Sequence, residues 1–336
     1  MTMKNIWADL PKPILTLAPM EDVTDTVFRQ IVASCVQPDV FFTEFMSCDG
    51  FLSKGHDMVS RRLKYSKNEH PIVAQIWGYN PEHFYAVAKI LPTLGFDGID
   101  INMGCPQKNV VKNGACAGLI KNPALTKEII TAVREGIEAS GKPIPLSVKT
   151  RIGYTKIITE EWITFLLSCS LDALTVHGRT AKEMSKVPAH WDEIAKAVSI
   201  RDSMHVGTVI IGNGDVANAS DALEKCTTYK TDGAMIGRGI FDNPWCFDRF
   251  TPAHIPNPSE LLSLCVRHVK LYEKTWVKQK NYEALKKFFK MYIKGFDRAS
   301  EFRIRIMETS SPDEIYPILE EIGHLLSSPR TRGSSV

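Results

Sequence analysis

The chain has 336 residues, 44% of them hydrophobic and 24% charged, and a formal net charge of +3. This length favours one large domain with a smaller appendage, and the composition is that of an ordinary globular protein. So mild a charge does not imply a polyanionic partner unless the basic residues are concentrated in one region.

The N-terminus and the cysteines indicate a reduced, cytoplasmic protein. The opening MTMKNIWADLPKPILTLAPM is not a secretion signal, because Pro11 and Pro13 interrupt its apolar stretch. No apolar run approaches the roughly 18 residues of a membrane span. The eight cysteines (35, 48, 105, 116, 169, 226, 246 and 265) include no Cys-x-x-Cys pair, which disfavours a disulfide framework and a zinc ribbon. We expect a monomer with no metal, no membrane contact and no obligate protein partner.

Apolar, strand-like runs alternate with amphipathic helical stretches along the first 250 or so residues. The expected strands are 13–18, 40–45, 71–78, 98–104, 144–153, 173–178, 208–215 and 233–239. The expected helices are 25–35, 81–95, 123–140, 159–169, 191–200, 217–226 and 243–250. This alternation implies right-handed parallel crossovers, and eight of them at this spacing predict an α/β fold, a closed (β/α)8 TIM barrel.

A doubly wound open sheet is the alternative fold. It is disfavoured because no GxGxxG follows the first strand, and because polar residues follow nearly every strand instead of one switch point. In a barrel, all post-strand loops converge on one face. That face would gather Met20, Gln75, Asn102, Cys105, Lys149, Arg151, His177, Arg179, Asn213 and Arg238.

Beyond the barrel the pattern changes to helices only. Prolines in HIPNPSE mark a linker, and the helical periodicity that follows breaks at Asn281, Gly295 and Ser311. We therefore expect a barrel over 1–251, a linker over 252–258, a small helical bundle over 259–326 and a disordered tail over 327–336.

The bundle concentrates the positive charge of the chain. Between Arg267 and Arg305 lie twelve Lys or Arg against four Asp or Glu, a net of +8, which leaves −5 for the rest. Two basic rows step by three or four residues: Arg267, Lys270, Lys274 and Lys278, then Lys287, Lys290, Lys294 and Arg298. A solvated helix face would explain one row, whereas two rows favour a nucleic-acid surface. Lys274, Lys287, Lys290 and Lys294 are the candidate contacts.

Two glycine-containing loops follow the last two strands. They are IGNGD at 211–215 and IGRG at 236–239, where barrels commonly bind phosphate through backbone N–H groups. Glycine permits close backbone approach, and Arg238 adds charge. Each loop alone would be a tight turn, but together they favour a phosphorylated cofactor.

Two pairs of basic residues end neighbouring strands. In SVKTRIG we expect either Lys149 or Arg151 to face the barrel axis, where a cation could stabilise negative charge on a reduced ring nitrogen. An internal ion pair is the alternative. His177 and Arg179 have the same spacing, and a lone histidine is usually structural, but this one belongs to a convergent set.

Cys105 differs from the other cysteines. Gly104 and Pro106 force a tight turn on the same face, and Asn102 lies beside it to hydrogen-bond a ligand. A thiol with a pKa of ~8.5 is mostly protonated at neutral pH and can act as a general acid or as a nucleophile. Spacing alone leaves both roles open.

These segments together resemble the tRNA-dihydrouridine synthase family, flavoenzymes that reduce the 5,6 double bond of selected tRNA uridines. The similar motifs, in chain order, are LAPMEDVTDTVFR, TEF, AQIWG, GIDINMGCPQKNVVKNGA, VKTRIG, VHGRTAKE, NGD and IGRGIFDNPW. KKFFKMYIKGF is similar to the family's C-terminal helical domain. The resemblance covers residues from about 14 to 325.

The resemblance implies an FMN-bearing barrel, NADPH as reductant, and tRNA held between barrel and bundle. It implies that Cys105 donates a proton to uracil C5 while hydride from the flavin reaches C6. It implies FMN contacts from Pro19, Met20, Gln75, Lys149, His177, Asn213, Gly214, Asp215, Gly237 and Arg238. It implies that Asn102, Arg151 and Arg179 lie near the target uridine or its phosphate.

Two departures from the family's pattern stand near these motifs. Cys116 occupies a position where small residues such as glycine are commoner, and Met184 and Ser185 occupy positions where many members carry an aromatic residue. A flavin-dependent reductase of a free pyrimidine or enone, and a non-catalytic RNA-binding barrel, remain alternatives. The first leaves the +8 segment unexplained, and the second would tolerate Cys105→Ala.

Overall fold

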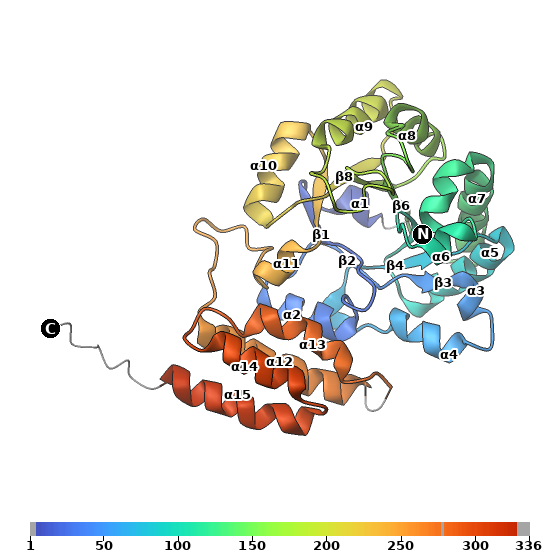
Figure 1. Ribbon diagram of the computed structural model, residues 1–336. Helices are drawn as coiled ribbons and strands as arrows, with labels where there is room; N and C mark the ends of the chain where they lie inside the picture. Colours follow the sequence, from blue (N-terminus) through green and yellow to red (C-terminus); the bar gives the residue numbers. More distant parts are fainter. Residues whose placement is uncertain (1–4, 277–278, 328–336) are drawn as a thin grey trace.

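A ring of parallel strands forms the centre of the molecule (Figure 1). The computed structural model describes residues 5–276 and 279–327. The strands are β1 (Ile14–Leu17), β2 (Phe41–Phe42), β3 (Met46–Ser47), β4 (Ile72–Trp77), β5 (Gly98–Met103), β6 (Leu146–Arg151), β7 (Ala173–His177), β8 (Val209–Asn213) and β9 (Gly233–Ile236). All eight expected strand regions are confirmed, and β3 is a second short segment that pairs with β4 beyond β2.

The sheet closes into a barrel. Its strand order is β1-β9-β8-β7-β6-β5-β4-β2, with every pair parallel. An isolated parallel bridge between Thr16 and Val40 joins β1 to the residue before β2. The (β/α)8 expectation is therefore confirmed, and the carboxyl ends of the strands point to one mouth.

Helices surround the barrel between successive strands (Figure 1). The longer ones are α2 (Thr26–Cys35), α5 (Pro81–Ile90), α7 (Pro123–Ala139), α8 (Thr159–Leu167), α9 (Trp191–Ser203) and α10 (Ala219–Tyr229). The shorter ones are α1 (Ile6–Asp9), α3 (Cys48–Phe51), α4 (His56–Val59), α6 (Lys108–Lys112) and α11 (Gly239–Asp242). Four short 3-10 helices, η1 (Ser60–Leu63), η2 (Lys67–Glu69), η3 (Leu91–Leu94) and η4 (Cys116–Lys121), complete the barrel.

The helix expected at 243–250 is wrong. The only helix after β9 in that part of the chain is the four-residue α11, and the residues from 244 onward form turns. The Asp248 side chain explains this difference, because its oxygens accept the backbone N–H groups of Phe250 and His254 and so hold this segment in turns.

The barrel interior is closed at the end opposite the mouth. Trp7 of α1 is 1% exposed and belongs to a buried cluster with Ile14, Phe42, Val73 and Met235. Its ring centroid lies 6.1 Å from that of Phe42. Because α1 and these side chains fill the lower barrel, space for a ligand remains at the carboxyl ends.

Four C-terminal helices form a bundle beside the barrel (Figure 1). They are α12 (Pro258–Trp276), α13 (Glu283–Tyr292), α14 (Ala299–Glu308) and α15 (Pro312–Ser327). Phe28 of α2 stacks on Phe288 of α13 with ring centroids 4.9 Å apart, so the bundle shares an apolar seam with the barrel. Of the expected tail, residue 327 belongs to α15, and residues 328–336 lie outside the described residues. Lys278 of the first basic row also lies outside them. Of the helices described, none is long and apolar enough to cross a membrane.

A buried ion pair anchors α2 beneath this seam. Arg29 and Glu69 are both fully buried, with Nε and Oε2 2.5 Å apart. Arg29 Nη1 and Nη2 donate to the carbonyls of Thr24 and Lys64. These bonds satisfy the guanidinium, which would otherwise be an uncompensated charge in the interior.

Arg29→Ala should lower the free energy of unfolding by about 3–5 kcal/mol, because it leaves the Glu69 carboxylate buried without its partner. The shift in the urea midpoint measures this loss. The matched control is Arg305→Ala, which removes the exposed pair with Glu321 and should leave the midpoint near that of the parent. Equal shifts for the two variants would contradict the interpretation.

Candidate functional site

A cavity of about 690 Å³ opens at the carboxyl ends of the strands. This volume suits a cofactor-sized ligand. Fourteen of the candidate residues line it: Pro19, Met20, Gln75, Asn102, Cys105, Lys149, Arg151, His177, Arg179, Asn213, Gly214, Asp215, Gly237 and Arg238. The barrel thus brings together residues that lie more than 200 positions apart, as the fold requires.

A chain of buried hydrogen bonds runs from the barrel core to the Cys105 turn. Asp100 Oδ2 accepts from Gln75 Nε2 at 2.7 Å, and Gln75 Oε1 accepts from Asn102 Nδ2 at 3.1 Å. Asn102 Oδ1 then accepts the backbone N–H groups of Gly104 and Cys105, both at 3.0 Å. Since a carboxylate only accepts, Asp100 fixes the orientation of both amides and thereby of the turn.

Burial and hydrogen-bond donors have opposite effects on the pKa of Asp100. Burial raises the pKa of Asp100 to about 6, against hydrogen bonds from Ser147 and Gln75 and the charge of Lys149. Ser147 Oγ donates to Asp100 Oδ1 at 2.6 Å. The carboxyl is therefore ionised at neutral pH, the form that this hydrogen-bond chain needs.

Cys105 is half-buried at the cavity wall and more acidic than an ordinary thiol. A hydrogen bond from the Cys116 thiol is the largest influence and lowers the pKa of Cys105 to about 7, with help from the Gln107 N–H and the charge of Arg151; burial opposes the shift. The sequence had suggested a mostly protonated thiol, whereas this pKa populates thiol and thiolate together at neutral pH. A group with such a pKa is well matched to proton transfer.

Lys149 supplies a buried positive charge to the cavity wall. Its Nζ donates to Asn213 Oδ1 at 2.9 Å, and Asn213 Nδ2 donates to the Met235 carbonyl. Burial, reinforced by Arg151, lowers the pKa of Lys149 to about 8. The amine therefore remains mostly protonated at neutral pH.

The expectation that only one of Lys149 and Arg151 faces inward is wrong, because both line the cavity. Residues two apart on a strand point to the same face. Arg151 Nε donates to the Gly104 carbonyl at 2.7 Å, and its Nη1 donates to the carbonyls of Thr180 and Met184. Arg151 therefore ties the Cys105 turn to the loop after β7.

His177, Arg179, Asp215 and Arg238 form a second polar group, which begins on the strand next to Arg151. Arg179 Nη1 lies 3.1 Å from His177 Nε2, and Arg179 Nη2 pairs with Asp215. Burial and the neighbouring cations hold the pKa of His177 well below its usual range, so the ring is neutral. Because a guanidinium only donates, Nε2 accepts and the ring proton lies on Nδ1.

Asp215 joins the two arginines of this group. It accepts from Arg179 and, at 3.2 Å, from Arg238, and these contacts, led by the Arg179 hydrogen bond, lower its pKa. Arg179 is 2% exposed, whereas the Arg238 side chain is 65% exposed. Arg238 is therefore the guanidinium with freedom to reach a ligand.

The loops after β8 and β9 leave room for close backbone approach. Gly214 has φ +121°, and a Cβ there would meet Ala189 at 2.7 Å. A Cβ on Gly239 would lie 2.2 Å from the Ala217 carbonyl oxygen, whereas one on Gly237 would meet only Ala18 at 3.7 Å. Glycine at 214 and 239 is thus required by packing, and Gly237 borders open space in the cavity.

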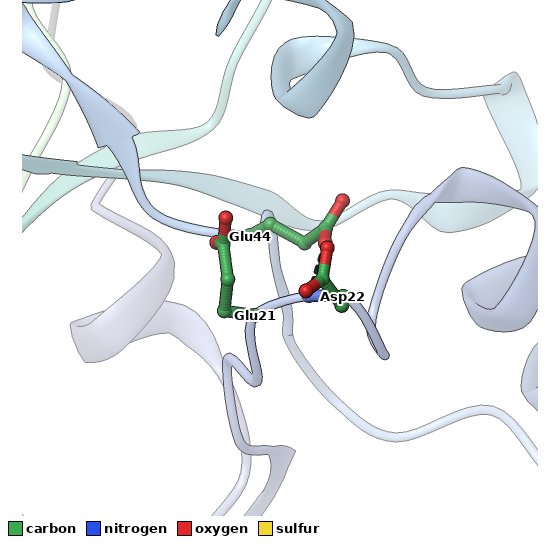
Figure 2. A group of neighbouring side chains, drawn as sticks. All are labelled: Glu21, Asp22 and Glu44. Carbon is green, nitrogen blue, oxygen red and sulfur yellow. Dashed lines mark hydrogen bonds between the residues drawn. The ribbon is translucent and has the colours of Figure 1, made fainter. Parts of the chain in front are cut away.

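Three carboxylates from the loops after β1 and β2 converge at the rim (Figure 2). The side chains of Glu21, Asp22 and Glu44 place one oxygen each within 4.8 Å of the others. Arg62 pairs with Glu21, and Lys280 Nζ lies 3.6 Å from Glu44 Oε2. These two cations offset part of the negative charge of the three carboxylates.

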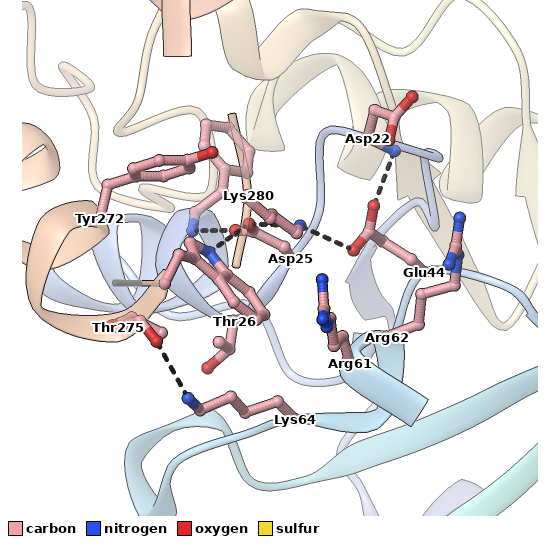
Figure 3. Close-up of polar contacts among 12 residues, drawn as sticks. Asp22, Asp25, Thr26, Glu44, Arg61, Arg62, Lys64, Tyr272, Thr275 and Lys280 are labelled. Carbon is pink, nitrogen blue, oxygen red and sulfur yellow. Dashed lines mark hydrogen bonds and ion pairs between the residues drawn. The ribbon is translucent and has the colours of Figure 1, made fainter. Parts of the chain in front are cut away.

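Lys280 links the bundle to this rim (Figure 3). Its Nζ lies 2.9 Å from Asp25 Oδ2, which also accepts from Trp276 Nε1 at 2.9 Å. Asp25 in addition caps α2 by accepting from the Phe28 N–H. Burial raises the pKa of Glu44 to about 7 despite the Lys280 charge.

The four candidate lysines of the bundle lie outside the cavity wall. Lys287 Nζ and Lys294 Nζ donate to the backbone carbonyls of Asp22 and Asp242. These bonds place the second basic row, named the α13 row for its lysines in and just after α13, beside the mouth. Lys290 is exposed on α13, like Lys287. Lys274 instead borders a separate hollow of about 410 Å³ between α12 and α2, so the two basic rows border different surfaces.

Sequence reasoning missed Asp100, Ser147, Glu44 and Lys280. An aspartate within the apolar strand GIDINMG was the available signal, because a carboxylate at a buried position needs donors. Lys280 carried no such signal, since it was one of twelve basic residues in the segment. Its role depends on where the bundle packs.

Ser147→Ala should lower the free energy of unfolding by about 1.5–3 kcal/mol at pH 7.5, because it removes a donor from an ionised carboxyl. The loss should be smaller at pH 5. The folded-state pKa of Asp100, about 6, lies above its reference of 3.8, so the carboxyl is mostly neutral at pH 5 in the folded protein only. Urea midpoints at both pH values measure this, with the exposed Ser199→Ala as control; equal losses at the two pH values would contradict it.

Lys280→Met should destabilise the protein by about 3–5 kcal/mol at pH 8, because it leaves Asp25 and Glu44 without their counter-charge. Below pH 6 the loss should be smaller, since the raised pKa of Glu44 lets the folded protein take up a proton there. Urea midpoints at pH 8 and 5.5 measure the difference. Lys142→Met, on an exposed turn, is the control, and a pH-independent loss would count against this role of Glu44.

Comparison with known proteins identifies the family. A family model described as dihydrouridine synthase (Dus) matches residues 16–326. "Probable tRNA-dihydrouridine synthase 2" of Bacillus subtilis (strain 168) is 43% identical over 321 residues, which covers 95% of this chain and 96% of that protein. "Probable tRNA-dihydrouridine synthase" of Staphylococcus aureus (strain Mu50) is 43% identical over 323 residues, 95% of each chain. The chain belongs to the dihydrouridine synthase family.

Proposed function

We propose that this protein is a cytoplasmic tRNA-dihydrouridine synthase that reduces the 5,6 double bond of uridines in tRNA, with FMN as its bound cofactor and NADPH as reductant. The observation that carries the proposal is the position of Cys105 on one wall of a cavity whose other wall holds the two glycine-containing loops. The family membership and the names of the relatives support the same activity.

The residues at the cavity fit a flavin mononucleotide. Gly237 borders open space, and Arg238 is exposed beside it. With Asn213 and Gly214 they would hold the phosphate. Asp215 acts through its two arginines, which it keeps in place beside that group.

The flavin ring would lie toward the other end of the cavity. Gln75, Lys149 and His177 would contact it, and Pro19 and Met20 would line its edge. Bound FMN would supply the hydride for uracil C6. The buried charge of Lys149 favours electron density on the ring, because a cation in a low-dielectric wall is poorly screened.

Cys105 holds the proton that uracil C5 needs. The hydrogen-bond chain from Asp100 fixes its turn, and Arg151 ties that turn to the loop after β7. Asn102 and the Arg179 group lie beside it and would position the base and its phosphate. With a pKa of about 7, Cys105 keeps a protonated fraction at working pH and can recover its proton from solvent.

The α13 row would bind the tRNA backbone near the mouth. Lys287, Lys290 and Lys294 read phosphates and carry no base information. The target uridine must leave its stack to enter the cavity, at a cost of a few kcal/mol that backbone contacts offset. Lys274 would contact a more distant part of the same molecule from α12.

Cys105→Ala should lower dihydrouridine formation on unmodified tRNA by about 10²–10⁴-fold, the usual contribution of a general acid. The variant should retain FMN and oxidise NADPH at the parent's rate, because the phosphate loops and Lys149 are untouched. Nucleoside mass spectrometry measures the product, and flavin absorbance measures the cofactor. Cys169→Ala, whose thiol donates to the Phe165 carbonyl and is not among the residues that line the cavity, is the matched control.

Three results would contradict the proposal. A colourless protein purified without flavin would argue for a non-catalytic RNA-binding barrel. Full dihydrouridine formation by Cys105→Ala would remove the assigned proton donor. Turnover of free uridine equal to that of tRNA would favour a reductase of small molecules.

A further inference from the structure

We propose that Cys105 and Cys116 form an oxidation site, at which an oxidant of the peroxide class converts the two thiols into one intramolecular disulfide. The site itself stands on the geometry of the pair. Its consequence for catalysis rests on the proposed role of Cys105 as proton donor.

The two cysteines lie on neighbouring backbone segments. The Ala117 N–H donates to the Cys105 carbonyl at 3.2 Å, so the segments that hold Cys105 and Cys116 lie side by side. The Cys116 thiol is also the group with the largest effect on the pKa of Cys105, which it lowers. A disulfide between the two cysteines therefore needs no large movement of either segment.

The backbone at Cys116 is in an unfavourable conformation for a residue with a side chain. Its φ is +51°, in the left-handed region that glycine adopts readily. Gly114, two residues earlier, has φ +82°. A cysteine held in this way beside the cavity is a constraint of the kind that gathers at functional sites, and here it directs a second thiol at Cys105.

The two members of the pair differ in access. Cys105 is half-buried and lines the cavity, whereas Cys116 is 1% exposed. An oxidant in solution therefore reaches Cys105 first and leaves Cys116 as the resolving thiol. The lowered pKa of Cys105 supports this order, since the thiolate is the nucleophile toward peroxides.

The chemistry balances in two steps. The Cys105 thiolate attacks a peroxide oxygen, the O–O bond breaks, and Cys105 becomes a sulfenic acid while hydroxide or alkoxide leaves. Cys116 sulfur then attacks the Cys105 sulfur, the S–O bond breaks, and the Cys116 proton leaves with the departing oxygen as water. Two electrons pass from the sulfur pair to the peroxide, and a dithiol reductant can return them.

The other cysteines are poorer targets. Burial raises the pKa of the Cys35 thiol to about 12, and burial also raises the pKa of Cys169. Cys48 lies close enough to influence Cys116, but it is fully buried and its pKa is raised by burial. Oxidation at low peroxide concentration should therefore be confined to the Cys105 and Cys116 pair.

The test uses the full-length, FMN-loaded protein, reduced and then treated with a small excess of hydrogen peroxide. Intact-mass spectrometry should show the loss of two hydrogens, and a thiol titration should show the loss of two thiols. Tryptic mapping should join the peptide 90–108, which holds Cys105, to the peptide 113–121, which holds Cys116. A dithiol reductant should restore both thiols and the original mass.

Variants distinguish disulfide formation with Cys116 from oxidation of Cys105 alone. Cys116→Ser and Cys116→Ala should gain oxygen atoms at Cys105 under the same treatment, in place of the cross-link. Cys169→Ala should cross-link like the parent. Gain of oxygen without a cross-link in the parent, or a link from Cys48 (peptide 30–54) to Cys116, would overturn the proposal.

Activity distinguishes this proposal from the proposed function. Peroxide should abolish dihydrouridine formation by the parent reversibly and leave NADPH oxidation intact. In Cys116→Ser the fraction of Cys105 that has gained two or three oxygen atoms should resist the dithiol, because sulfinic and sulfonic acids are not reduced by thiols. A cross-linked protein that still forms dihydrouridine would support the oxidation site and would instead overturn the role of Cys105 as proton donor.

Discussion

Parallel pairing through the whole ring is the constraint on which the site depends. Because each strand runs in the same direction and β1 returns to the segment before β2, the carboxyl ends of all strands meet on one rim. Thr16, Gln75 and Asn213 occupy separate parts of the sequence, yet the closed register places their strands around one axis. An open sheet would have spread the same residues along an edge.

Within that ring, buried polar groups determine how the functional turn is held. Asp100 lies fully buried among apolar strand residues and is satisfied by Ser147 and Gln75. Because the Asp100 carboxylate can only accept, it determines which amide group donates at each step of the hydrogen bonds through Gln75 and Asn102. The Cys105 turn is consequently set from inside the barrel, while Arg151 fixes it from the loop side.

The repeating part of the fold could be predicted from sequence, because strand and helix periodicities are local. All eight strand regions were found, and fourteen candidate residues reached the cavity because the barrel topology alone brings post-strand loops together. The failures had non-local or stereochemical causes. Hydrogen bonds to the Asp248 side chain hold the segment of the expected helix 243–250 in turns, and Lys149 and Arg151 share a face because strand residues two apart do so.

The hydrogen-bond and ion-pair partners of individual side chains could not be predicted from the sequence, for a different reason. The distance from Asp25 to Lys280 along the chain exceeds 250 residues, and nothing local to either residue announces the other. The two basic rows could be recognised in the sequence. That one row borders the mouth and the other the hollow between α12 and α2 depends on how α12 and α13 pack. Such packing is settled by the apolar seam around Phe28 and Phe288.

Lys287 of α13 and Lys294, two residues after it, affect how ionic strength acts on this protein. Their amines donate to barrel carbonyls, and they are the same amines that we propose to contact the tRNA backbone. Added electrolyte screens exposed charge over about 8–10 Å at near-physiological concentrations, but it screens a charge–carbonyl contact less than a charge–charge contact. Part of each amine's interaction is already used in the contact between the bundle and the barrel. The salt dependence of tRNA affinity should therefore correspond to fewer released counterions than there are lysines at the mouth.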